Sequence, residues 1–190
     1  VYMSIQEKAF GGGIDRMPDF SFRIMSFLFL LRDLLTPFDR KLGSFGIDKG
    51  DTVIDYGCGP GSYLSRSSAL TGPEGKVFAA DIHELAIQSV NRRIKEKKLN
   101  NVEAVKIDSY KCPLPDNTAD IIYALDMFHM VKEPQRFLNE LHRLLKKDGK
   151  LIIDDGHQSR KKSLRKISDS NLWDIAENRK GWIVAVPKKS

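Results

Sequence analysis

The chain has 190 residues, of which 41% are hydrophobic and 29% charged, and its mean hydropathy is −0.35. These values are ordinary for one globular domain, so they exclude disorder as the default state of the whole chain. The net charge of +6 permits attraction to nucleic acid, anionic lipid or an acidic substrate, and it does not choose among them.

The two cysteines, Cys58 and Cys112, form no CxxC pair and match no cysteine–histidine spacing of a metal site. We therefore predict no metal and a reducing, cytoplasmic location. No basic start followed by an apolar run is present at the N-terminus, so no secretory signal is expected. The most apolar stretch, residues 20–35, is interrupted by Arg23 and Arg32 and is too short in its uncharged part to span a bilayer.

Residues 1–46 carry no strand pattern and are mostly helical in character. We expect them to form an N-terminal helical extension, or lid, on a main domain of residues 47–190. The apolar segment 20–35 is compatible with a helix that closes the site, with a dimer surface or with a peripheral membrane contact. Its polar residues do not share one clean helical face, which weakens the membrane interpretation.

From residue 52 onward, expected strands, loops and helices alternate. Short apolar runs predict strands over 52–56, 76–80, 102–107, 119–125 and 150–154. Apolar residues at helical spacing predict helices over 62–70, 84–99 and 134–147. This alternation predicts an α/β fold with a parallel sheet and helices on both faces. Two last runs, 172–178 and 182–187, are close enough to form an antiparallel hairpin at the sheet edge.

Ligands of open parallel sheets bind beyond the carboxyl ends of the strands. The first expected strand ends at Asp55 and is followed by Gly57, Gly59 and Gly61. Glycines at alternate positions let the backbone turn tightly and approach a ligand closely. The turn leads into a helix N-terminus, where free backbone N–H groups can bind an acceptor atom.

The next strand ends supply further polar groups. Asp81 follows the second strand, where a carboxylate can accept hydrogen bonds from both hydroxyls of a ribose. Asp108 and Ser109 follow the third strand, in a position to contact an adenine. The glycine loop alone would be a weak signal, because many such loops are only turns. Together with these carboxylates it predicts a site for an adenosyl cofactor.

The segment Val53-Ile-Asp-Tyr-Gly-Cys-Gly-Pro-Gly61 resembles the first motif of class I S-adenosylmethionine-dependent methyltransferases, and the ubiquinone/menaquinone-biosynthesis ("type 11") branch is the most similar. Further segments that resemble this family are 78–81, 108–109, 114–120, 128–131 and 136–153. The resemblance implies a Rossmann-like, doubly wound, seven-stranded sheet whose last strand is antiparallel. It also implies S-adenosyl-L-methionine as the cofactor and methyl transfer as the activity.

The resemblance implies cofactor contacts for residues beyond the first four strands, namely Asp55, Gly57, Gly59, Gly61, Asp81, Ile82, Asp108, Ser109 and Leu125. Asp55 and the glycines would lie under the methionine part, Asp81 would hold the ribose, and Ile82 would pack on the adenine. The backbone near Leu125 would approach the sulfonium.

A sulfonium is a reactive methyl donor, so the protein has mainly to align the acceptor and exclude water. A general base is needed only for a protonated acceptor. His129 is the candidate for this role because histidine titrates near neutrality, although it can equally be a packed residue below the site. Asp126 can orient a substrate or contact the cofactor amine, or simply face solvent in its loop.

The predicted function is methyl transfer to a small acceptor, with lipophilic acceptors among those considered. A nucleic-acid or protein methyltransferase and a non-catalytic S-adenosylmethionine-binding protein are the alternatives. We expect no nucleic-acid partner, because residues 124–129 lack the Asn/Asp-Pro-Pro-aromatic signature of enzymes that grip a flipped base. The basic run 160–166 is expected to be a solvated helix face or a site that attracts phosphate or anionic lipid.

Overall fold

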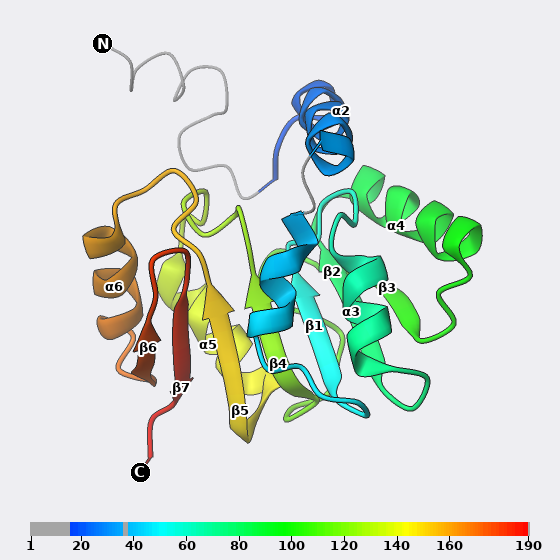
Figure 1. The fold of residues 1–190 in the computed structure, drawn as a ribbon. Coiled ribbons are helices and arrows are strands. Elements are labelled where there is room, and N and C mark those ends of the chain that lie inside the picture. The colour runs from blue at the N-terminus through cyan, green and yellow to red at the C-terminus, as the bar shows by residue number, and fades with distance from the viewer. Residues whose placement is uncertain (1–15, 36–37, 190) are drawn as a thin grey trace.

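The computed structural model describes residues 16–35 and 38–189, so residues 1–15 and 36–37 of the expected extension lie outside the described part (Figure 1). The centre of the fold is a seven-stranded sheet with the order β3-β2-β1-β4-β5-β7-β6. The strands are β1 Thr52–Tyr56, β2 Lys76–Asp81, β3 Val102–Lys106, β4 Ala119–Ala124, β5 Leu145–Ile153, β6 Trp173–Asn178 and β7 Ile183–Pro187.

The first five strands are parallel, and β7 is antiparallel to both of its neighbours, β5 and β6. The predicted α/β sheet with an antiparallel terminal hairpin is therefore confirmed. The strand order reverses between β1 and β4, and in folds of this type the ligand binds outside the carboxyl ends at that point.

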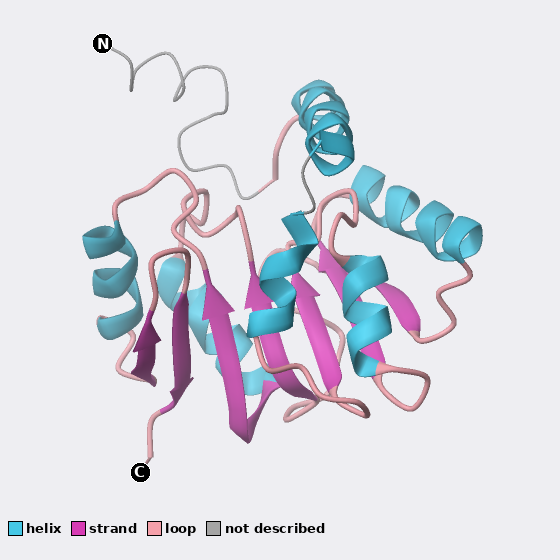
Figure 2. Cartoon of the chain, viewed as in Figure 1, coloured by secondary structure: helices cyan, strands magenta, loops and turns pink. Residues whose placement is uncertain are grey.

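Helices cover both faces of the sheet, as predicted (Figure 2). They are α2 Asp19–Leu35, the 3-10 helix η1 Phe38–Ser44, α3 Leu64–Thr71, α4 Glu84–Lys97, α5 Pro134–Leu144 and α6 Arg160–Ser168. One face packs on η1, α3 and α4, whose buried residues include Leu42, Leu64 and Val90. The other face packs on α5 and α6, through residues such as Leu138 and Ile167.

The junction of α5 and β5 differs from the prediction. The expected helix over 134–147 ends at Leu144, and Leu145 already has the extended conformation of β5. Leu145 pairs with Ala119 across a register irregularity and is only 2% exposed. Burial of this leucine against the sheet therefore outweighs the helical propensity of the two lysines that follow it.

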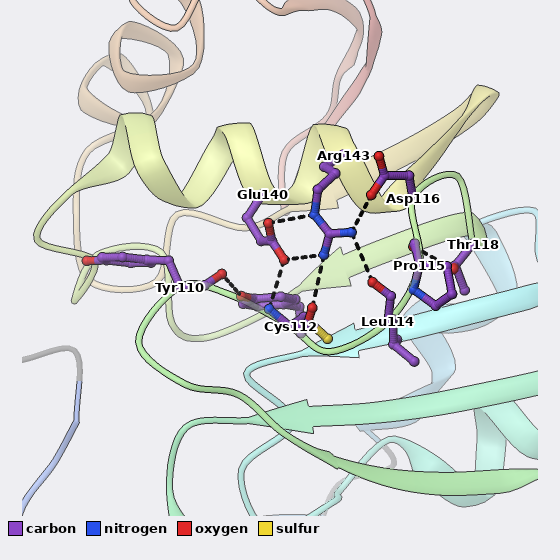
Figure 3. Close-up of polar contacts among 9 residues, drawn as sticks. Tyr110, Cys112, Leu114, Pro115, Asp116, Thr118, Glu140 and Arg143 are labelled. Carbon is purple, nitrogen blue, oxygen red and sulfur yellow. Dashed lines mark hydrogen bonds and ion pairs between the residues drawn. The ribbon is translucent and has the colours of Figure 1, made fainter.

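Arg143 at the end of α5 fastens the long connection between β3 and β4 (Figure 3). Its guanidinium donates hydrogen bonds to the carboxylates of Glu140 and Asp116 and to the backbone carbonyls of Cys112 and Leu114. Glu140 in turn accepts the backbone N–H of Cys112 at 2.8 Å. One planar cation thus satisfies acceptors from a loop that has no regular secondary structure.

Replacing Arg143 with alanine is expected to lower the free energy of unfolding by about 2 kcal/mol, because charged hydrogen bonds to the loop are lost. Arg136→Ala removes an exposed pair with Glu133 on the same helix and is expected to cost less than about 0.5 kcal/mol. Urea unfolding of both variants measures the difference.

The same variants carry a pH test. Arg143 and the N–H of Cys112 lower the pKa of Glu140. The ionised Glu140 therefore contributes to the free energy of unfolding above the ordinary glutamate pKa, and this contribution is lost as the pH falls through the lowered pKa. The difference in free energy of unfolding between Arg143→Ala and the unchanged chain should therefore become smaller in acid. A deficit no larger than that of Arg136→Ala at neutral pH would contradict the role of Arg143.

Candidate active site

A cavity lies at the carboxyl ends of β1, β2 and β4, and α2 stands over these strand ends (Figure 1). Its wall contains many of the residues that the sequence analysis selected, namely Gly57, Gly59, Asp81, Ile82, Ser109, Leu125 and Asp126. Others do not line it, namely Asp55, Gly61, Asp108 and His129. The strand-end positions therefore converge, but not every side chain there reaches the cavity.

The glycine loop crosses the end of β1 with backbone conformations that few side chains tolerate. Gly57 has a φ of +81°, and a Cβ atom there would approach Cγ of Met127 to 2.9 Å. Gly59 has a φ of +51°, and a Cβ atom there would meet nothing within 4 Å. Gly57 is thus required for close packing, whereas Gly59 leaves its backbone open for a ligand.

Asp81 ends β2 and is only 8% exposed. One carboxylate oxygen accepts the N–H of Gly59 at 2.9 Å, and the other accepts the N–H of His83 at 2.7 Å. Burial raises the pKa of this carboxyl, while the two backbone donors oppose the rise. Each oxygen of a carboxylate has two lone pairs, so Asp81 can still accept two ribose hydroxyls.

Asp55 is buried beneath the glycine loop, on the side of the sheet that carries Tyr123. Burial raises its pKa to about 8, so the carboxyl is largely protonated at neutral pH. One of its oxygens, Oδ2, is buried without a hydrogen-bond partner in the described part of the chain.

Asp126 follows β4 with a φ of +60°, an uncommon conformation for aspartate. Its N–H donates to the carboxylate of Asp154 at 2.8 Å, and Tyr63 donates its hydroxyl hydrogen to Asp126 at 3.2 Å. Lys41 of η1 contacts the same Asp154 at 3.3 Å. Asp154 therefore fixes the turn that places Asp126 at the cavity wall.

His129 lies against the loop after β5, away from the cavity. Its ring meets that of His157 edge-on at 4.8 Å between centroids. A Cβ atom on Gly156 would approach Nδ1 of His129 to 2.1 Å, so the ring is packed directly on this backbone. Burial lowers the pKa of His129 to about 4. The imidazole is thus neutral at pH 7 and a weak base, and its place gives no geometric support to a catalytic role.

The opposite wall of the cavity is apolar. Its residues come from α2, the segment before α2, the loop after β4 and α5, and they include Met17, Phe22, Met25, Phe29, Met127, Met130, Val131 and Phe137. Phe22 stacks on His83 with ring centroids 4.2 Å apart. Nε2 of the same histidine lies 3.4 Å from Asp19 of α2. His83 therefore ties α2 to the end of the strand that carries Asp81.

Two features of the site were missed by the sequence analysis. Asp154 directly follows β5, and the strand-end rule that selected Asp81 and Asp108 would have selected it as well. Tyr63 was not among the selected residues, but it lines the cavity and donates a hydrogen bond to Asp126. The apolar segment 20–35 was one candidate to close the site, but the side chains that line the cavity could not be selected, because only the tertiary fold decides which face of α2 meets the strand ends.

The residues fit S-adenosylmethionine. The backbone at Gly59, where a Cβ atom would meet nothing within 4 Å, and the acceptor pair on Asp81 suit its amino-acid and ribose parts. Within residues 16–35 and 38–189, no cluster of histidine, cysteine or carboxylate side chains is placed to hold a metal ion. In the same part of the chain, no helix has both the length and the apolarity to cross a membrane.

The sequence model of a family described as "Methyltransferase domain" matches residues 47–184. The ubiquinone/menaquinone biosynthesis C-methyltransferase of Escherichia fergusonii is 32% identical over 109 residues, which cover 57% of this chain and 43% of that protein. This chain thus spans less than half the length of the curated relatives that it matches.

Solved structures are similar over a larger share of the chain. A S-adenosylmethionine-dependent methyltransferase from Aquifex aeolicus is 30% identical, with a TM-score of 0.73 and coverage of 77% of this chain and 87% of that chain. The geranyl diphosphate C-methyltransferase of Streptomyces coelicolor A3(2) is 18% identical, with a TM-score of 0.60 and coverage of 70% and 55%. At that identity the second likeness concerns the fold alone.

Proposed function

The chain belongs to the family of methyltransferase domains, and we propose that it transfers a methyl group from S-adenosylmethionine to a small lipophilic acceptor. One observation carries the proposal. The cavity joins a strand-end cradle for an adenosyl group to a wall of apolar side chains, and both parts meet at the loop after β4.

On the cofactor side, Asp81 accepts the ribose hydroxyls and the glycine loop leaves room for the methionine part. Ile82 and Ser109 lie where the adenine would pack, because both line the cavity beyond β2 and β3. S-adenosylmethionine supplies an activated methyl group when it is bound. The protein's own contribution is to hold the acceptor in line with that group and to keep water out.

On the acceptor side, the side chains of α2 and of the loop after β4 present thioethers and aromatic rings rather than charges. Asp126 is the exception, and apart from it such a wall favours a ligand with an apolar body and disfavours a nucleotide or a charged peptide. The relative from Escherichia fergusonii is named as a carbon methyltransferase of quinone biosynthesis, which supports quinol-like or phenolic acceptors. Asp126 is our candidate to orient the acceptor and to take its proton, since it is the carboxylate after β4 that lines the cavity.

Two measurements test the proposal. Calorimetry with the full chain should detect binding of S-adenosylmethionine and of its demethylated product. Mass spectrometry should then detect transfer of a deuterated methyl group to alkylphenols or quinols, and little transfer to sulfonated phenols with the same nucleophile. Absence of cofactor binding at millimolar concentration would overturn the proposal, and so would a preference for the sulfonated acceptors. The cytoplasmic location and the lack of a nucleic-acid partner stay predictions from the sequence.

A further inference from the structure

The helix α2 presents apolar side chains on two opposite faces. Its inner face contributes Phe22, Met25 and Phe29 to the cavity. Its outer face carries five large apolar side chains that are exposed, namely Phe20 (75%), Ile24 (47%), Phe27 (60%), Leu28 (56%) and Leu31 (41%). We call these five residues the outer stripe. Exposure of so many neighbouring large apolar groups indicates a surface that binds something.

The spacing of the outer stripe places it on one side of the helix. At 3.6 residues per turn, its members fall within an arc of about 100°. The polar residues of this segment share no clean face, but they do not interrupt the apolar stripe. Arg23 is exposed and borders the stripe at the next angular position.

A polar groove lies between α2 and α4, beside the outer stripe. Arg23 and Ser26 line it from α2, and Gln88, Ser89 and Arg92 line it from α4. Neither arginine makes an ion pair with any residue in the described ranges, and both are exposed. Two guanidinium groups with hydroxyl and amide groups between them suit a phosphate, which accepts several such donors at once.

We propose that the outer stripe and this groove dock the protein on an anionic phospholipid bilayer. The stripe would enter the boundary between headgroups and acyl chains, and the arginines would meet the phosphates. The net charge of +6 favours approach to such a surface. A second copy of the chain suits the surface less well, because a two-fold pair would bring exposed arginines of like charge from both subunits to one border.

The docking surface gives the lid a second role, and this part of the inference rests on the proposed function. The same helix that would lie on the bilayer forms, with its other face, one wall of the cavity. A lipophilic acceptor dissolved in the bilayer would then reach the cavity without crossing bulk water.

Vesicle sedimentation with the full chain, without cofactor or acceptor, tests the docking surface. We expect binding to vesicles of phosphatidylcholine and phosphatidylglycerol in equal parts, little binding to phosphatidylcholine alone, and weaker binding as salt is added. Replacing both Arg23 and Arg92 with glutamine should lower the partition coefficient about thirtyfold. The pair Phe27→Ser and Leu28→Ser should lower it at least about tenfold.

Matched controls come from the far end of the sheet. Ile175→Ser removes an exposed apolar residue of β6, and Arg165→Gln removes an exposed cation of α6. Both should bind vesicles as the unchanged chain does. Calorimetry with S-adenosylhomocysteine reports on the folded cofactor site independently of vesicle binding. All of these variants should retain S-adenosylhomocysteine binding.

Several results would overturn the docking proposal. One is loss of vesicle binding in the controls as large as in the stripe variants. Another is binding of inorganic phosphate by the two arginines without any vesicle binding. A third is a dimer in sedimentation velocity that Phe27→Ser dissociates. Vesicle binding without cofactor binding would support docking and overturn the proposed function. Cofactor binding without vesicle binding would support the proposed function and overturn docking.

Discussion

Replacing Asp81 with asparagine is expected to weaken S-adenosylmethionine binding about a hundredfold. The carboxylate offers acceptors for two ribose hydroxyls, and a hydrogen bond to a charged group is worth about 1.5–3 kcal/mol. Two such bonds amount to about 3 kcal/mol, and every 1.4 kcal/mol changes affinity tenfold. The amide would also direct a donor toward an N–H group, either that of Gly59 or that of His83.

The pH dependence of binding offers a second view of the same group. Burial raises the pKa of Asp81, so the carboxylate should be protonated at a higher pH than an exposed aspartate. Affinity for S-adenosylmethionine should therefore fall as the pH is lowered through this raised pKa, because a protonated carboxyl accepts fewer hydrogen bonds. The affinity of Asp81→Asn for S-adenosylmethionine should not change over this pH range.

Calorimetry with adenosine separates recognition of the ribose from damage to the loop. Adenosine carries the ribose but no methionine part, so its affinity should fall in Asp81→Asn by the same factor. Glu84→Gln removes an exposed carboxylate close by in the sequence, outside the cavity wall, and should change affinity less than threefold, or about 0.6 kcal/mol. Unchanged affinity in Asp81→Asn would rule out the strand-end carboxylate as the ribose ligand.

The fold was predictable because its signals are local. The buried strands are short apolar runs, the longer helices have an apolar face, and the connections between the first five strands are too long for hairpins. Strand-end logic then placed the glycine loop and Asp81 beside each other, and the structure joins them by a hydrogen bond from Gly59. Spacing along the sequence was enough for this pair because parallel strands end at one edge.

Side-chain direction was less predictable than position. Asp55 lies within β1, so strand alternation turns it toward Tyr123 and away from the cavity. Asp108 is exposed in a turn that bridges to Lys111. His129 follows the right strand, but its ring packs on the loop around Gly156. These orientations depend on turns and packing partners that are distant in the sequence.

The extent of the lid also depends on tertiary contacts. The expected extension of residues 1–46 includes η1, yet Leu42 is 0% exposed and Phe45 is 3% exposed in a cluster with the central strands. These two residues are therefore part of the core. A deletion that tests the lid should end at residue 36, before η1 begins.

Deleting residues 1–36 is expected to lower methyl transfer to a lipophilic acceptor at least about a hundredfold. The deletion removes the α2 side of the apolar wall and opens the cavity to water. Loss of acceptor alignment and of water exclusion affects the chemical step more than cofactor binding. Affinity for S-adenosylmethionine should fall less than about tenfold, since the ribose and loop contacts remain and the losses beside Asp81 are the Phe22–His83 stack and the Asp19–His83 contact.

Point variants on the two faces of α2 decide whether the wall itself is responsible. Met25→Ser places a hydroxyl in the cavity wall and should raise the KM for the lipophilic acceptor, with cofactor affinity unchanged. Phe27→Ser makes a comparable change on the outer stripe and should leave transfer to a detergent-dispersed acceptor unaltered. If both variants behaved alike, or if the deletion left turnover and acceptor selectivity intact, α2 could not be the lid. A difference between them would assign selectivity to the inner face, because helix length and charge are the same in both and each variant gains one serine.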